Sequence, residues 1–181
     1  MATLELNSSA LSRTVAFTGR LASMTRAEAF GVVRQHGGTP SPAVTKRTSV
    51  VVIGELGWPL LDDGRPSNKL SKARTYGVPV VSERRFLEWI GKAAPDPDTK
   101  TYSAEQIAAL CKLSGDTIHD LAQWRLLDEL GGRFGFRDLA SARQIAGLLA
   151  AGVRLSEVVR SVTEVRKWMH LHGKEVVCGF A

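Results

Sequence analysis

The chain has 181 residues, of which 44% are hydrophobic and 23% charged, enough apolar material for one large core or two small ones. Its net charge of +6 lies almost wholly in the first hundred residues, so we expect a polyanion to meet that half. The cysteines and histidines lack the spacing of metal ligands, which argues against a zinc site and a disulfide framework. The sequence also lacks an apolar run of ~18 residues and an apolar leader, which argues against a membrane protein and predicts a cytoplasmic one.

Short β-rich segments alternate with helical patterns in the first half. The segments are Thr14–Phe17, Ser49–Ile53 and Val78–Val81. This alternation predicts an α/β fold with a small parallel sheet flanked by helices.

The first helix begins at a capping box, Thr25–Glu28, in which a hydroxyl and a carboxylate each satisfy a backbone N–H. Its expected core face ends with His36, interpreted as a core histidine rather than a ligand. The segment Gly54–Pro66 is rich in Gly, Pro and Asp and predicts an exposed loop, in which Trp58 packs locally.

Residues 91–100 contain two prolines and four charges without apolar periodicity, so we interpret 93–100 as a linker. The second half, 101–172, is expected to be mainly α. A capping box at Ser103–Gln106 opens a helix with Ile107, Leu110 and Cys111 inward, and Ser114 caps a second helix. With the glycine-containing hairpin Gly131–Phe136, these helices predict a winged helix-turn-helix.

A last amphipathic helix is expected from about Ser156, with Val158, Val162, Val165 and Met169 at helical spacing. Residues 173–181 are interpreted as a tail or as the start of a further segment.

Two segments of the first half together predict a phosphate pocket. Thr18-Gly19 ends a strand and supplies a hydroxyl and an amide, while Lys69 opens a later helix and supplies charge. A Thr-Gly pair alone would indicate only a turn. Lys69 and Arg26 change that interpretation, because a phosphate dianion needs directed donors as well as cations.

Residues 11–92 resemble a BRCT domain of the class found in bacterial NAD-dependent DNA ligases and in the large subunit of replication factor C. The resemblance rests on Phe17–Leu21, Thr25–Glu28, Gly37–Gly38, Val44–Gly54, Ser67–Ala73, Tyr76–Pro79 and Phe86–Ile90. It implies a four-stranded parallel sheet. It also implies that Thr18, Gly19 and Lys69 hold a phosphate and that Arg26 assists with a 5′-phosphorylated DNA end. The long Gly54–Pro66 loop departs from the pattern.

Residues 101–172 resemble the DNA-binding domain of MerR-type regulators. The resemblance rests on Tyr102-Ser103, Ile107-Ala108, Ser114, Thr117-Ile118, Leu126-Leu127 and Arg133. Where that family presents an arginine followed by a tyrosine, this chain has His119-Asp120, with Asp116 one turn earlier, and carboxylates oppose a phosphate backbone. The auxiliary DNA-binding residues are expected to be Arg20, Lys72, Thr117, His119, Arg125 and Arg133.

These features favour a non-enzymatic DNA-binding protein of repair, replication or transcription regulation, in the cytoplasm or on the nucleoid. No nucleophile elbow, Walker loop or carboxylate pair indicates an enzyme, and no cofactor or metal is expected. Two alternatives stay open: an adaptor that binds a phosphopeptide of a partner protein, and a MerR-like transcriptional regulator. The oligomeric state does not follow from the sequence.

Overall fold

The computed structural model describes residues 11–92 and 99–172. The first range contains the expected parallel sheet, with strand order β2 (Thr39–Ser41), β1 (Thr14–Thr18), β3 (Val50–Ile53) and β4 (Val80–Ser82). Val15 lies opposite Val50, and Val51 opposite Val80. The edge strand β2 carries no strong sequence signal, since its three residues include Pro40.

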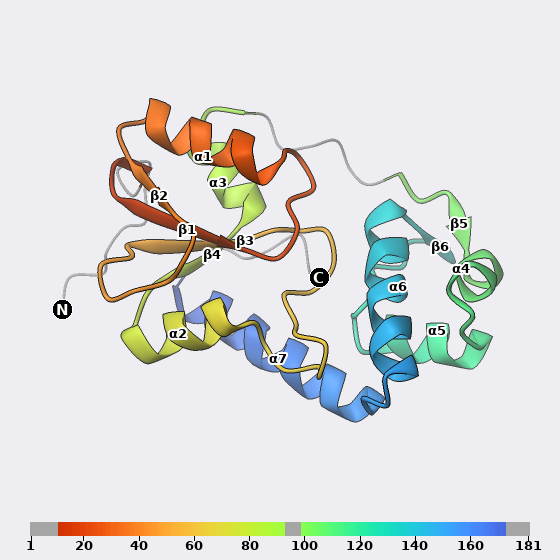
Figure 1. The fold of residues 1–181 in the computed structure, drawn as a ribbon. Coiled ribbons are helices and arrows are strands. Elements are labelled where there is room, and N and C mark those ends of the chain that lie inside the picture. The colour runs from red at the N-terminus through yellow and green to blue at the C-terminus, as the bar shows by residue number, and fades with distance from the viewer. Residues whose placement is uncertain (1–10, 93–98, 173–181) are drawn as a thin grey trace.

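The two faces of the sheet are covered by different helices (Figure 1). Alternate strand residues point to opposite faces. Val15 and Phe17 pack toward α1 (Arg26–Gln35) and α3 (Glu83–Trp89), and Ala16 and Val51 toward α2 (Asn68–Tyr76) and α7 (Leu155–His172). Every residue of β3 is buried, as expected for a strand covered on both faces.

The capping box of α1 is confirmed: the Thr25 hydroxyl accepts a bond from Glu28 N, and the Glu28 carboxylate accepts one from Thr25 N. The assignment of His36 to the core is wrong. His36 is the exposed C-cap of α1, and its Nδ1 lies 2.9 Å from the Val32 carbonyl oxygen. The helix ends one residue too early for the apolar face to continue through it.

The second range contains α4 (Ala104–Cys111), α5 (Gly115–Gln123), α6 (Phe136–Ala150) and α7. The capping box at Ser103–Gln106 is confirmed, and Ser114 caps α5. Leu110, expected to point inward, is 50% exposed.

A two-residue turn supplies the expected hairpin. Gly131 and Gly132 both have positive φ, and Leu130 and Arg133 exchange two backbone hydrogen bonds across them. This is the geometry that two glycines permit without strain. The strand that follows, β6 (Arg133–Phe134), pairs antiparallel with β5 (Tyr102–Ser103).

The expectation that the 54–66 loop lies exposed with Trp58 packed within it is wrong. Trp58 is 4% exposed and belongs to the apolar core formed by α4, α5, α6 and the start of α7. Its backbone N–H donates to Gln144 Oε1 at 2.7 Å, and Gln144 Nε2 donates to its carbonyl at 2.6 Å. The loop is long because it crosses from the sheet to this second core.

Helix α7 joins the same two cores. Val158 and Val162 pack in the helical half, whereas Val165, Trp168 and Met169 pack beneath the sheet against α2. Figure 1 shows α7 running from the end of α6 to α2. The interpretation of 93–100 as a linker and of 173–181 as a tail falls largely or wholly outside the described residues. In residues 11–92 and 99–172, no helix is long and apolar enough to cross a membrane.

Candidate phosphate-binding site

The structure brings the pocket residues together at the carboxyl end of β1. Thr18 is the last residue of that strand, Arg26 opens α1, and Lys69 lies in the first turn of α2. The Thr18 hydroxyl lies 2.7 Å from the hydroxyl of Ser67, the N-cap of α2. Lys69 Nζ donates to the Phe17 carbonyl oxygen at 2.9 Å. Two helix starts and one strand end therefore share a small volume.

Arg26 closes the pocket from the other side. Its Nη2 donates to the Gly19 carbonyl oxygen at 2.6 Å, and its guanidinium carbon lies 5.8 Å from the Phe17 ring centroid. Its Nη1 is buried and has no partner among the described residues. A buried donor without an acceptor is costly, and an acceptor oxygen brought by a ligand would offset that cost.

The charges of the two pocket cations, Lys69 and Arg26, repel each other. Burial lowers the pKa of Arg26, and burial followed by the charge of Arg26 lowers the pKa of Lys69. Among the described residues, the ion pairs include neither side chain. An anion placed here would be attracted by both charges and would raise both pKa values again.

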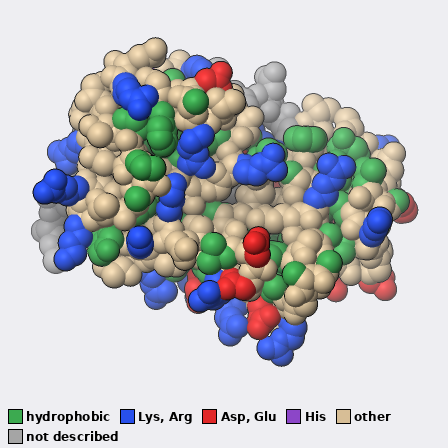
Figure 2. Space-filling model, viewed as in Figure 1, with side chains coloured by type: hydrophobic (Ala, Val, Ile, Leu, Met, Phe, Trp, Pro, Cys, Tyr) green, Lys and Arg blue, Asp and Glu red, His purple; other side chains and the backbone are tan. Residues whose placement is uncertain are grey.

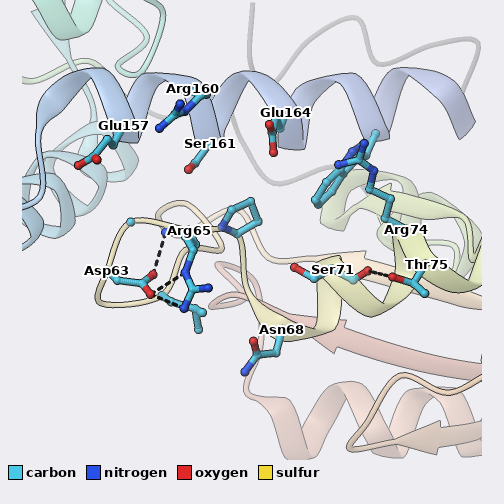
Figure 3. A pocket seen from close by; sticks show the side chains of 14 residues that line it. Asp63, Arg65, Asn68, Ser71, Arg74, Thr75, Glu157, Arg160, Ser161 and Glu164 are labelled. Carbon is cyan, nitrogen blue, oxygen red and sulfur yellow. Dashed lines mark hydrogen bonds and ion pairs between the residues drawn. The ribbon is translucent and has the colours of Figure 1, made fainter.

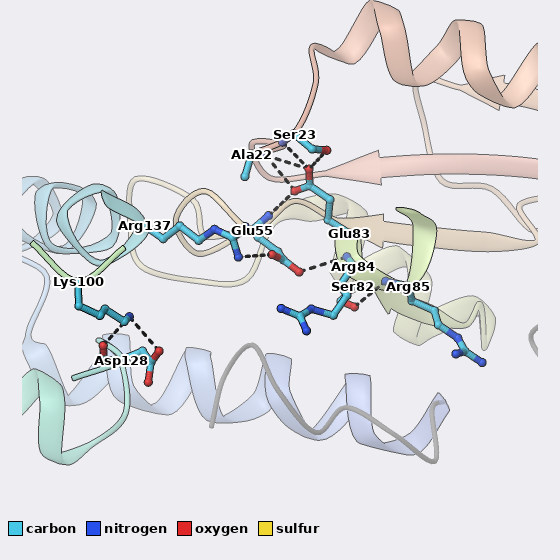
Figure 4. A network of polar contacts seen from close by, with 10 residues as sticks. All are labelled: Ala22, Ser23, Glu55, Ser82, Glu83, Arg84, Arg85, Lys100, Asp128 and Arg137. Atoms are coloured by element: carbon cyan, nitrogen blue, oxygen red, sulfur yellow. Dashed lines mark hydrogen bonds and ion pairs between the residues drawn. The ribbon is translucent and has the colours of Figure 1, made fainter. Parts of the chain in front are cut away.

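A buried carboxylate that the sequence did not reveal shapes the loop between Thr18 and α1. Glu83 is 1% exposed and accepts hydrogen bonds from the backbone N–H groups of Ala22, Ser23 and Glu55. Figure 4 shows this fan of contacts. Buried charges persist only when they are hydrogen-bonded in this way. Because Glu83 opens α3 directly after β4, it fastens the pocket loop to the rigid sheet.

The backbone at Gly54, directly after β3, lies very close to the loop that follows Thr18. A Cβ atom on Gly54 would lie 2.1 Å from the carbonyl oxygen of Arg20, so only glycine allows the β3 end to pass the pocket loop.

The auxiliary residues are not brought to one place. Arg20 borders the pocket and is exposed, and Lys72 lies on the exposed side of α2. The other four belong to the helical half: Thr117 and His119 on α5, Arg125 after it and Arg133 on β6. Arg133 donates to the Thr101 carbonyl oxygen at 3.0 Å, and Arg125 has a φ of 57°.

A separate hollow of about 930 Å³ lies between α2, α7 and the 61–66 loop (Figure 3). Its walls carry both signs of charge, with Arg74 on α2 and with Glu157, Arg160 and Glu164 on α7. Asp63 is already paired with Arg65 at 2.6 Å. This mixed lining lacks the uncompensated positive charge of the pocket at Thr18.

Comparison with known proteins identifies the first half of the chain. Residues 8–90 match the family model described as the BRCA1 C Terminus (BRCT) domain. A DNA ligase of Petrotoga mobilis is 40% identical over 76 residues, and one of Chlorobium phaeobacteroides is 42% identical over 78 residues. These matches cover 42% and 43% of this chain but only 10% of each ligase.

A DNA ligase of Roseiflexus sp. is 34% identical over 97 residues, which is 54% of this chain and 12% of the ligase. The chain thus spans about a tenth of the length of these relatives. The part of the chain that these comparisons match is the part that forms the parallel sheet and the helices α1, α2 and α3. Residues 8–90 form a BRCT domain, and its relatives are the BRCT regions of bacterial DNA ligases.

Proposed function

We propose that this protein binds DNA without acting on it chemically, and that the BRCT pocket holds a DNA phosphate, at a 5′ end or in the backbone. One observation carries the proposal: Lys69 and Arg26 meet at the end of β1, and among the described residues neither has a counterion and the buried Arg26 Nη1 has no partner. A phosphate offers the charge and the acceptor oxygens that this arrangement requires.

The chemistry of the pocket explains each member. The Thr18 hydroxyl can donate to a phosphate oxygen once it turns from Ser67, and the start of α2 points partial positive charge at the same place. Lys69 and Arg26 supply full charges, of which Arg26 also offers directed donors. The pocket binds and orients a phosphate, and no general base or nucleophile is proposed beside it.

DNA is favoured over a phosphopeptide by two observations. The relatives of the BRCT domain are DNA ligases, and the positive charge of the chain lies in the same half as the pocket. A phosphopeptide adaptor is the rival hypothesis, since a phosphoserine presents the same dianion.

The helical half is proposed to add a second DNA contact as a MerR-like winged helix-turn-helix. The order α4, tight turn, α5, glycine turn and α6 supports this proposal. Asp116 on the exposed side of α5 opposes close approach to phosphates. We therefore assign duplex contact to the cations Arg125 and Arg133, and a role as a promoter-reading regulator is the third hypothesis.

Fluorescence anisotropy with two otherwise identical duplexes, with and without a 5′-phosphate, tests the pocket. Lys69→Ala is expected to weaken binding of the phosphorylated duplex by about ten- to a hundred-fold, as for loss of a hydrogen bond to a charged group. Lys46→Ala removes an exposed lysine that precedes β3, at the amino end of the parallel strands and away from the pocket, and serves as the matched control. If the wild type binds both duplexes equally well and Lys69→Ala binds each of them as tightly as the wild type does, the proposal is refuted. A preference for a phosphoserine peptide over DNA would favour the rival.

A further inference from the structure

The carboxyl end of the sheet, where the pocket lies, carries further cations besides Lys69 and Arg26. Arg20 follows β1, Arg84 lies next to Glu83 after β4, and Arg137 reaches this end from α6 of the helical half. Backbone contacts join these segments, because Leu56 N donates to the Arg20 carbonyl oxygen at 3.0 Å. The adjacent Glu55 accepts from Arg84 N at 3.1 Å and from Arg137 Nη1 at 2.6 Å. The segments that carry the three arginines are therefore neighbours, and we call the surface that they border the strip.

The carboxylates of this strip face inward. Glu83 is 1% exposed and Glu55 8% exposed, and both are occupied by backbone N–H groups, with Arg137 as a further partner of Glu55. Their charge holds the loops together and is only weakly felt by solvent. Because Glu55 is already paired with Arg137, the positive charge that the strip offers to a ligand comes mainly from Arg20 and Arg84.

Arg84 shows the same unfilled bonding as Arg26. Its Nε is buried and has no partner among the described residues, although the side chain as a whole is only half-buried. Figure 4 shows this side chain extending from the start of α3 toward the helical half, on the side from which Arg137 arrives. In Figure 2, Lys and Arg side chains are spread over both halves, at the top and at the bottom of the view, and most visible Asp and Glu side chains lie in its lower part.

Building on the proposed DNA function, we propose that Arg20, Arg84 and Arg137 form a second phosphate subsite, beside the pocket and across the junction between the two halves. The ligand is then a nucleic-acid strand with at least two phosphates engaged, one in the pocket and one or more along the arginines. A phosphorylated side chain of a protein supplies a single dianion and leaves the second subsite empty. Arg137 lies outside residues 8–90, so the subsite needs the helical half as well as the BRCT domain.

The test is the salt dependence of DNA binding by the full chain, with the 5′-phosphorylated duplex and its unphosphorylated twin. Arg84→Gln and Arg20→Gln are each expected to weaken both duplexes by about five-fold and to reduce the slope of log K against log salt by about 0.9. The ratio between the two duplexes should stay as in wild type. Arg34→Gln, an exposed arginine in the last turn of α1, removes the same charge away from the strip and should change neither quantity.

The outcomes separate this subsite from the pocket. If both variants behave like Arg34→Gln while Lys69→Ala still abolishes the 5′-phosphate preference, the second subsite is overturned and the pocket stands. If Lys69→Ala has no effect, the pocket itself fails. Binding of a phosphoserine peptide with no DNA affinity overturns the second subsite and the DNA function, and assigns the pocket to the rival adaptor hypothesis. Should Arg84→Gln unfold, Arg20→Gln decides, because its side chain is exposed and borders the same strip.

Discussion

Trp58→Ala is expected to cause a large loss of stability, although Trp58 lies in a loop. The indole is 4% exposed in the core of the helical half, and truncation of such a side chain costs roughly 3–5 kcal/mol. The guanidinium carbon of Arg166 lies 5.1 Å from the indole centroid, and losing this contact adds roughly 0.5–1 kcal/mol. The bonds from Gln144 reach only the Trp58 backbone, so they remain in the variant.

Urea unfolding and calorimetry measure the effect. A total of about 5 kcal/mol is a large part of the roughly 5–15 kcal/mol by which domains are stable, and for this length it corresponds to a fall in Tm of roughly 10–20 °C. Because the loop joins the two cores, the two halves of the variant are also expected to unfold in separate transitions. Trp124→Ala is the matched control, since that indole is 44% exposed and the change should cost at most about 1 kcal/mol. A Trp58→Ala variant as stable as Trp124→Ala would refute the role of the loop as a structural bridge.

Three further changes test other parts of the structure. Glu83→Gln should cost roughly 2–4 kcal/mol in urea unfolding, because its buried carboxylate collects several backbone N–H groups; the exposed Glu88→Gln should cost little, and equal losses would contradict this. Gly147→Ala, in the interior of α6 with open space at its Cβ position, should stabilise the protein by about 0.5–1 kcal/mol, and a lower Tm would count against it. Burial and the charge of Arg26 lower the pKa of Lys69 from 10.5. Between the lowered pKa and 10.5 the unfolded chain therefore binds more protons than the folded one, and this group makes the stability of the fold rise with pH. Over the same range Lys69 loses its charge in the folded protein, so the affinity for phosphate falls. Lys69→Arg should remove both dependences, and unchanged profiles in unfolding and anisotropy would refute the assignment.

Local signals predicted the elements that hold the site. The capping boxes at Thr25–Glu28 and Ser103–Gln106 are confirmed. They could be predicted because their hydrogen bonds join residues only three positions apart. The parallel sheet is also confirmed, and the structure brings Thr18 and Lys69 together as the alternation of strands and helices implies. Phosphate binding by these residues stays a prediction.

The contacts between the two halves could not be predicted from local patterns. Trp58 and Gln144 are 86 positions apart, and so little in their local sequence indicates that they meet. The regular apolar spacing of α7 predicts a helix, but one continuous stripe serves two cores, with Val162 in one and Val165 in the other. Glu55 and Glu83 would ordinarily be expected on the surface, and only their long-range partners explain their burial.

The most direct test of the central claim is a ³¹P NMR titration of a 5′-phosphorylated duplex bound to the protein. A free phosphate monoester loses its second proton near pH ~6. If Lys69 and Arg26 hold the terminal phosphate, their charges will stabilise its dianion, and its resonance will titrate at a lower pH in the complex and return toward the free value with Lys69→Ala. A terminal phosphate that titrates in the wild-type complex as it does in free DNA would contradict the claim.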